Sequence, residues 1–488
     1  MNSFSPVLLF SLLLAAPAAM PAQFTYSTNA DNISVTITTY SGAGGAVTIP
    51  SITNGLTVTG VGPELFANLA GLTSVIIPAG VTTIGSNAFY GTGLTSVEIP
   101  GSVTNFGEFA FYGCGSLTNA TIDNGVTDIG LQAFCLCSNL VSVTIPASVA
   151  SFGEYAFNYC SNLTSATIPA SLTNMENQFF GCVNLRSVTI DDGVTDVGAS
   201  EFYNFGSATS VAIPSTVTNI GVWAFAYSGL SNVAIPGGVL AIASNAFYDC
   251  TNLTSVTIGN GVASIGISAF AYSTLTNVII PDSVTSIGSN AFFGTGLIHV
   301  TIPGGVTNMG QTVFAYCPNL AGATLLNGVT SIGAYQFYAC SNLTRVTVPM
   351  SVSNVGSEAF IYCGDLTTVL FQGNAPVVGV NAFYDATNAT AFYLPGATGW
   401  SSTLGGRPAV LWNPLIHASG SSFGVNGNQF GFNITGTANI PVVVETCANL
   451  ANPIWTPLTT NTLANGSFYF SEPFQPATPA RFYGLGLP

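Results

Sequence analysis

Apolar and polar residues alternate in a fixed unit that repeats along most of this chain. Each unit reads approximately Ile-Pro-x-x-Val-Thr-x-Ile-Gly-x-x-Ala-Phe-x-x-Cys-x-x-Leu-Thr-Ser-Val-Thr, and its phenylalanine recurs every 22 or 23 residues. A fixed period of this length is typical of a solenoid, in which each unit forms one coil and buries its apolar edge against the next coil. The recurring phenylalanines, which we expect to form the core, are Phe66, Phe89, Phe111, Phe134, Phe157, Phe180, Phe202, Phe225, Phe247, Phe270, Phe292, Phe314, Phe337, Phe360 and Phe383.

Within one unit, the segment from Leu140 to Ile145 shows the period of two that is typical of a β-strand. Val143 and Ile145 are expected to point inward, and Ser142 and Thr144 outward. A proline, which cannot donate to a strand ladder, then ends the strand. The Val-Thr-x-Ile-Gly part of the unit predicts a second short extended piece. The Ala-Phe part predicts one helical turn that places the phenylalanine in the core.

The outward positions of the main strand form a long series of short hydroxyl side chains with almost no charge. Two interpretations stay open. In the first, serine and threonine simply suit an exposed strand, and the surface binds no ligand. Alternatively, the series is a surface that binds something extended. The candidate ligand face comprises Ser142, Thr144, Ser165, Thr167, Ser187, Thr189, Ser255 and Thr257.

Changes in pattern along the chain predict five segments. Residues 1–22 contain an apolar run followed by small residues, which is typical of a secretory signal peptide. Residues 23–60 are expected to cap the first coil, and residues 61–395 to form the solenoid. Residues 396–417 break the period and predict a closing cap and linker. Residues 418–488 contain about five predicted strands, which indicate a small C-terminal module resembling a β-sandwich.

The charge of the chain limits the classes of molecule that it can bind. There is no lysine, the four basic residues are all arginines, and the formal net charge is −15. Such a chain repels phosphate backbones, so nucleic-acid binding is excluded. Apart from Val7–Met20, apolar residues occur only in short bursts. We therefore expect no transmembrane segment once the signal peptide is removed.

The ten cysteines raise the question of disulfide bonds. Neighbouring coils are close enough for such bonds, but equivalent side chains in a stack point the same way and do not converge. We therefore interpret most of these cysteines as small buried residues in a column. Cys135 and Cys447 lie outside that register. The repeat position contains Cys114, Cys137, Cys160, Cys182, Cys250, Cys317, Cys340 and Cys363.

Candidate chemistry is sparse, and we expect no catalytic, cofactor or metal site. His299 and His417 have no partner at the spacing of metal ligands. The letters Gly-x-Ser-x-Gly occur around Ser422, but a nucleophile elbow needs a strand before the serine, a helix after it and a histidine downstream. Here the serine lies in a Gly- and Ser-rich join, and His417 precedes it.

The repeated Ile-Pro, Ile-Gly, Ala-Phe, Cys and Leu-Thr motifs resemble the BspA-type leucine-rich repeats of bacterial surface proteins, over about 330 residues. The resemblance implies a mainly β, right-handed leucine-rich-repeat solenoid of about 14–15 coils with short helical turns, followed by a small all-β module. Several units depart locally from the motif: Met175-Glu176 replaces Ile-Gly, Phe179 and Glu201 replace the alanine, and Ala208 replaces the leucine.

The resemblance also implies a non-enzymatic, secreted or cell-surface scaffold for binding or adhesion, whose ligand is an extracellular protein or glycan. Two other functions remain open from the sequence. One is an accessory protein or hydrolase in polysaccharide breakdown, which would need a convergent pair of carboxylates. The other is an ice-binding surface made of the Ser/Thr ladder, although Glu98, His299 and Arg345 interrupt that array.

Overall fold

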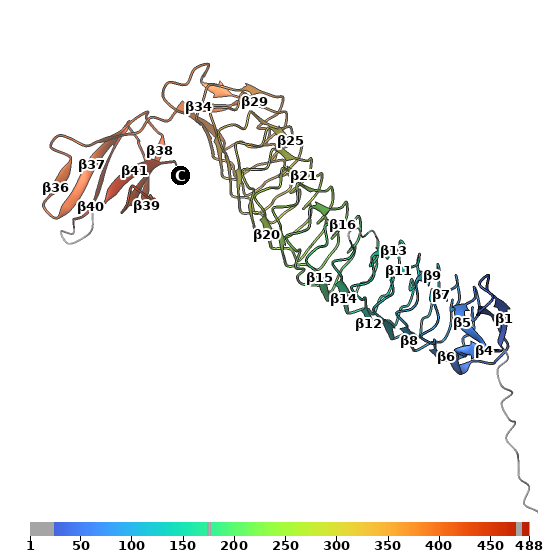
Figure 1. Ribbon diagram of the computed structural model, residues 1–488. Coiled ribbons are helices and arrows are strands. Elements are labelled where there is room, and N and C mark those ends of the chain that lie inside the picture. Colours follow the sequence, from blue (N-terminus) through green and yellow to red (C-terminus); the bar gives the residue numbers. More distant parts are fainter. Residues whose placement is uncertain (1–23, 173–174, 176, 475–480, 488) are drawn as a thin grey trace, which may run out of the picture.

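The computed structural model describes residues 24–172, 175, 177–474 and 481–487, so the expected signal peptide lies outside the described residues. Figure 1 shows an elongated, gently curved stack of coils, with a smaller group of strands beyond its end. The stack has about 16 turns, slightly more than the 14–15 expected from the sequence. The fold is mainly β, and no helix occurs in the described residues.

One strand from almost every coil forms the main side of the solenoid, and neighbouring strands pair in parallel. These strands break into three sheets, to which they contribute seven, three and six strands. The first break falls at the coil of Ser210 and Ala212, which contributes only isolated bridges to its neighbours. The main strands are β3 (Gly45–Thr48), β6 (Leu72–Ile76), β8 (Ser96–Ile99), β10 (Asn119–Ile122), β12 (Ser142–Thr144), β14 (Ser165–Ile168), β15 (Ser187–Ile190), β18 (Asn232–Ile235), β20 (Ser255–Ile258), β22 (Asn277–Ile279), β24 (His299–Ile302), β26 (Gly322–Leu325), β28 (Arg345–Val348), β30 (Thr368–Phe371), β32 (Thr390–Tyr393) and β34 (Arg407–Leu411).

A second series of shorter strands forms another side of the coils, as Figure 1 shows for β7, β9, β11 and β13. Each places an apolar residue inward, as in Thr83–Ile84, where Ile84 is fully buried. These strands are β5 (Leu56–Val61), β7 (Thr83–Ile84), β9 (Asn105–Phe106), β11 (Asp128–Ile129), β13 (Ser151–Phe152), β16 (Asp196–Val197), β17 (Asn219–Ile220), β19 (Ala241–Ile242), β21 (Ser264–Ile265), β23 (Ser286–Ile287), β25 (Asn308–Met309), β27 (Ser331–Ile332), β29 (Asn354–Val355) and β31 (Val377–Val378).

The core contains a continuous column of stacked phenylalanine rings that runs from Phe66 to Phe383. Neighbouring rings lie 4.8–6.2 Å apart between centroids and are close to parallel. Such offset stacking stabilises the pairs beyond the burial of their surface. At one coil, the prediction of which phenylalanine is buried was wrong. Phe179, not Phe180, is the buried member, and Gln178 takes the position of the usual alanine.

The Ala-Phe segments are turns, so the expectation of short helical turns was wrong. Two residues per coil adopt left-handed backbone angles; in the coil of Phe157 these are Tyr155 and Tyr159, with φ of 61° and 56°. Left-handed residues interrupt the regular dihedrals of an α-helix. The amide groups bond between coils instead, as when the Phe89 N–H donates to the Ala110 carbonyl oxygen at 2.8 Å.

Eight cysteines form the buried column expected from the repeat, and all ten cysteines are free thiols. In each of the eight, the thiol sulfur lies 3.0–3.3 Å from the backbone oxygen of the core phenylalanine of the preceding coil. The thiol therefore fills space and adds a second donor to a buried carbonyl oxygen, as at Phe134, whose oxygen also accepts the Cys137 N–H at 3.2 Å. Burial raises the pKa of the Cys160 thiol well above its usual value.

The N-terminal segment covers the first coil. Strand β1 (Phe24–Thr28) pairs antiparallel with β2 (Ser34–Tyr40), and β2 pairs in parallel with β5. A short strand β4 (Ile52–Thr53) forms a hairpin with β5. The rings of Phe24 and Tyr40 lie 6.5 and 5.0 Å from that of Phe66. These rings close the first end of the aromatic column.

At the other end, β34 extends the main sheet and pairs with β33 (Thr403–Leu404) in a hairpin. The Trp400 ring stacks 4.6 Å from Tyr393. Beyond it, two antiparallel sheets share a buried cluster that includes Phe432, Val442 and Phe470. Their strands are β35 (Leu415–His417), β36 (Gly424–Asn426), β37 (Gln429–Thr435), β38 (Pro441–Cys447), β39 (Thr456–Thr462), β40 (Ser467–Pro473) and β41 (Phe482–Gly486).

Candidate functional site: the strand face

The outward side chains of the main strands form one surface, which we call the strand face. Along most of these strands, buried and more exposed residues alternate, as in Ser187–Ile190. Register carries equivalent residues from coil to coil: Ser165 pairs with Ser187, and Thr167 with Thr189. Since paired strands lie about 4.8 Å apart, the hydroxyl groups form two parallel rows.

Two shallow depressions interrupt this surface. One, of about 310 Å³, lies over β12 and β14 and is lined by Ser142, Thr144, Ser165 and Thr167. Strands β12 and β14 pair only through Ser142 and Ser165 among the described residues, whereas β14 and β15 pair along their whole length. The depression therefore coincides with a weakly paired part of the sheet.

The second depression, of about 210 Å³, lies over β20 and β22. Ser255 and Thr257 line it together with Asn277 and Ile279. Ile279 is 76% exposed, so this depression combines hydroxyl and amide groups with one large apolar side chain. Of the eight residues of the candidate ligand face, Ser187 and Thr189 line neither depression. They continue the rows on β15.

The strand face is open along most of the solenoid and covered near its C-terminal end. The outward residues of β24, His299 and Thr301, are exposed, whereas Thr324 on β26 and Thr347 on β28 are half-buried. Thr368 on β30 is only 3% exposed. The accessible strand face therefore extends from β6 to β24.

The C-terminal strands produce this covering. The outward row changes from threonine to apolar residues at Leu370, Phe392 and Val410, which pair in register across β30, β32 and β34. These side chains pack into the same cluster as Phe432 and Val442. The indole N–H of Trp412 donates to the Pro441 carbonyl oxygen at 3.0 Å. Leu370 therefore belongs to a contact between two parts of the chain.

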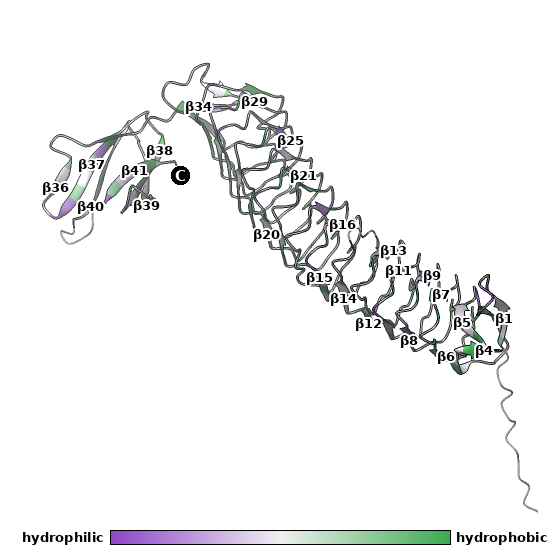
Figure 2. Cartoon of the chain, viewed as in Figure 1, coloured by the Kyte–Doolittle hydropathy of each residue, from purple (hydrophilic) through white to green (hydrophobic). Residues whose placement is uncertain are grey.

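The contact with the C-terminal strands also affects the pKa of a charged residue at the covered end, Arg345. Burial lowers the pKa of the Arg345 guanidinium, and the Glu445 carboxylate on β38 acts in the opposite direction. The open part of the strand face contains few charged side chains: Glu98 lies near one end of it, and Arg345 lies beyond the other end, on β28. Polar contacts within it are weak, such as the 3.2 Å bond from the Ser142 hydroxyl to the Asn119 side-chain oxygen. Figure 2 shows hydrophilic and hydrophobic stretches interleaved along the coils.

The family model of the BspA type leucine rich repeat region matches residues 59–181, 175–292 and 263–390, with six copies. The chain belongs to the BspA-type leucine-rich repeat family. No curated protein matches the chain.

Two solved structures are similar to this BspA-type chain. A leucine-rich repeat protein from Bacteroides ovatus is 22% identical, with a TM-score of 0.53; the match covers 78% of this chain and 95% of that protein. A leucine rich cell surface protein from Faecalibacterium prausnitzii is 29% identical, with a TM-score of 0.40, and the match covers 74% and 97%. The first likeness supports the solenoid fold.

Outside the repeats, Ser422 of the Gly-x-Ser-x-Gly motif and His417 make only local contacts. The Ser422 hydroxyl accepts a hydrogen bond from the Asn433 side chain at 2.9 Å, and the His417 ring contacts the Thr435 hydroxyl at 2.7 Å. The two residues therefore bond to different partners on β37. Within the described ranges, no three His, Cys, Asp or Glu side chains gather as a metal site would require. The same residues include no helix long and apolar enough to cross a membrane.

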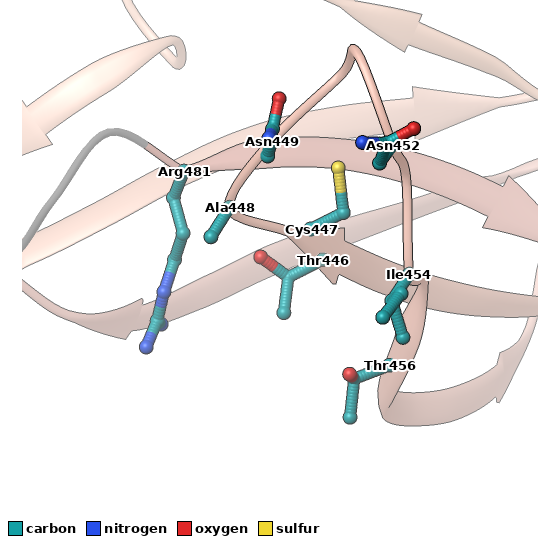
Figure 3. A pocket seen from close by; sticks show the side chains of 8 residues that line it. All are labelled: Thr446, Cys447, Ala448, Asn449, Asn452, Ile454, Thr456 and Arg481. Carbon is teal, nitrogen blue, oxygen red and sulfur yellow. The ribbon is translucent and has the colours of Figure 1, made fainter.

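The BspA-type chain also contains a pocket in its C-terminal strands that the sequence did not indicate. Its volume is about 390 Å³, and Figure 3 shows Arg481 on one side of it and Asn452 and Ile454 on the other. Arg481 donates to both carboxylate oxygens of Glu472, at 2.8 and 2.9 Å. Because this arginine is already paired, the pocket presents mainly amide, hydroxyl and methyl groups. Its lining residues are Thr446, Cys447, Ala448, Asn449, Asn452, Ile454, Thr456 and Arg481.

A second feature that the sequence reasoning missed is a row of surface aromatic rings on the turns. We call it the aromatic row, and its members follow the core phenylalanine of each coil by one or two residues. The sequence signal is an aromatic residue one or two positions after the core phenylalanine in each coil from Phe157 to Phe383. It comprises Tyr159, Phe180, Tyr203, Tyr227, Tyr248, Tyr272, Phe293, Tyr316, Tyr338, Tyr362 and Tyr384.

Proposed function

We propose that this chain is an exported, non-enzymatic scaffold that binds an extended protein or glycan at the cell surface through the strand face. The observation that carries this proposal is the open strand face between β6 and β24, whose two outward rows consist mostly of Ser, Thr and Asn and end where the C-terminal strands cover them. Inward residues are committed to packing, so the outward rows are a continuous surface that successive coils supply. Membership of the BspA-type family supports the same function, since proteins of this type resemble bacterial adhesins.

The chemistry of the strand face favours binding distributed over many weak contacts. Each hydroxyl group contributes a net hydrogen-bond free energy of only about 0.5–1.5 kcal/mol. The two depressions offer places for side groups of the ligand, and the scarcity of charge favours an uncharged ligand. A single substitution such as Thr144→Ala should therefore change the affinity little.

The decisive variant replaces Thr144, Thr167 and Thr189 together with arginine. These side chains are exposed and lie on the successive strands β12, β14 and β15, so the variant should fold normally and lose binding. Binding of the wild-type protein and the variant is measured on an array of matrix proteins and of glycans other than neutral β-1,4-linked polymers. An unchanged melting temperature shows that the fold is preserved.

A matched control carries the same three added charges on another side of the solenoid. Thr104, Thr127 and Thr218 are exposed and directly precede the second strands β9, β11 and β17. Their replacement by arginine should leave binding intact. If the strand-face variant binds at full strength, the ligand does not use these rows, and the proposed site is wrong.

A further inference from the structure

The aromatic row is continuous over the coils from Tyr159 to Tyr384. Neighbouring ring centroids lie 5.0–6.2 Å apart along its whole length. Trp223 widens the row at one place, since its ring lies 5.3 Å from Tyr248 and 6.4 Å from Tyr227. Monomeric soluble proteins rarely expose a contiguous apolar surface of this extent, and such a surface usually marks an interaction site.

The ring alternates between two backbone positions. It follows the core phenylalanine by one residue at Tyr248 and Phe293, and by two residues at Tyr227, Tyr272 and Tyr316. Between Tyr227 and Tyr362, rings at the second position are more exposed: Tyr272 is 47% and Tyr316 48% exposed, whereas Tyr248 and Phe293 are half-buried. From Tyr227 to Tyr362, an exposed ring therefore recurs every second coil, or about every 10 Å, twice the spacing between neighbouring strands.

The second position is an unfavourable place for a large side chain. Its backbone is left-handed, with φ of 59° at Tyr227, 61° at Tyr272 and 56° at Tyr316. Other coils fill the same position with residues that tolerate this conformation, such as Gly294 and Asn204. A strained tyrosine whose ring is almost half exposed gains little from burial. Such strain on a surface points to a functional role for the ring.

The exposed rings are held on a rigid framework. The backbone N–H of Tyr227 donates to the Tyr248 carbonyl oxygen at 2.8 Å, and the N–H of Tyr316 donates to the Tyr338 carbonyl oxygen at 2.7 Å. Each ring also packs against the half-buried ring of the next coil. Tyrosine loses little conformational entropy on binding and offers an apolar face with a polar end. The row is therefore a preorganised series of amphipathic platforms.

We propose that the aromatic row binds an extended, uncharged polysaccharide of β-1,4-linked hexopyranose units. The C–H face of a pyranose ring packs on the negative face of an aromatic ring. An extended β-1,4-linked chain presents the same sugar face at every second residue, and this repeat is close to the two-coil spacing of the exposed tyrosines. The site is separate from the strand face and goes beyond the function proposed above.

Charge restricts the ligand to a neutral polymer. The row itself contains no basic residue, and Asp249, Glu358 and Asp385 lie in the same turns. The chain carries a net charge of −15. Uronate or sulfate groups would therefore be repelled, whereas sugar hydroxyl groups can bond to the tyrosine hydroxyls and to these carboxylates.

The test compares the full chain with the variant Tyr272→Asn/Tyr316→Asn/Tyr362→Asn. Asparagine is suited to the left-handed backbone and occurs there as Asn204, so the variant removes three rings without straining the turns. Both proteins are run in native gels containing hydroxyethyl cellulose, or polygalacturonate as an acidic polymer, and are mixed with insoluble cellulose and chitin. Melting temperatures confirm that the variant is folded.

We expect the neutral β-1,4-glycans to retard the wild-type protein. The affinity of the variant for these glycans should be at least tenfold lower. Polygalacturonate should retard neither protein. The strand-face variant at Thr144, Thr167 and Thr189 should still bind these glycans, so the two sites fail independently. Absence of retardation of the wild-type protein, or equal retardation of the tyrosine variant, overturns the proposal. Sedimentation that changes from dimer to monomer in the variant, without glycan binding, would assign the row to self-association instead.

Discussion

At the residue scale, the turns depend on non-glycine residues in the left-handed conformation, and this makes one stabilising substitution predictable. Ser268 has φ of 53°, while Asn245 and Asn290 occupy the same position in the neighbouring coils. Asparagine tolerates this conformation better than serine because its side chain bonds locally to the backbone. Ser268→Asn should therefore increase the free energy of unfolding, by at most about 1 kcal/mol. Urea titration checks this, with Ser268→Ala as the control that gains nothing.

At the element scale, the cysteine column stabilises the stack through hydrogen bonds as well as packing. The Cys160 thiol donates to the Phe134 carbonyl oxygen at 3.2 Å, and Ser228 and Ser273 occupy equivalent positions in other coils. The Ser273 hydroxyl donates to the Phe270 carbonyl oxygen of its own coil at 2.7 Å, so Cys160→Ser should replace the bond between coils by one within the coil and keep most of the stability. Cys160→Ala removes one of the two hydrogen bonds to the Phe134 carbonyl oxygen, which still accepts the Cys137 N–H at 3.2 Å, and should cost about 0.5–1.5 kcal/mol for that bond. Equal denaturation midpoints for the two variants would show that the thiol acts only by its volume.

At the scale of the whole molecule, the buried thiols make stability depend on pH in the alkaline range. Burial raises the pKa of Cys135 and Cys250 to about 11 and that of Cys363 to about 12. The unfolded value lies near 8.5, so the folded protein favours the neutral thiol. This stabilisation is complete below about pH 8.5 and is lost as the pH rises through the folded values. The melting temperature should therefore be constant from about pH 6 to 8 and fall above about pH 9.

The variant Cys250→Ser provides the control for this pH dependence. Serine does not titrate in this range and already occupies the equivalent positions Ser228 and Ser273. The decline above about pH 9 should therefore become shallower in the variant. A decline of the same steepness would mean that other groups cause the alkaline unfolding.

The sequence by itself determined the period, the alternation along the main strands and the charge of the chain. These are local properties: Val143 and Thr144 point to opposite sides because strand side chains alternate, and the 22- or 23-residue spacing sets one coil. The repeat also placed the cysteines in one column. Each of these inferences needs only neighbouring residues and the assumption that equivalent positions stack.

The tertiary structure decided what depends on contacts between coils or between distant segments. The turn conformation follows from amide bonds between coils, which compete with a helix, and stacking places Phe179 in the core in place of Phe180. The covering of Leu370 requires strands that lie more than sixty residues later in the chain. The aromatic row emerges only when rings at two alternating backbone positions converge on one line, because the left-handed turns bring both positions to the same surface.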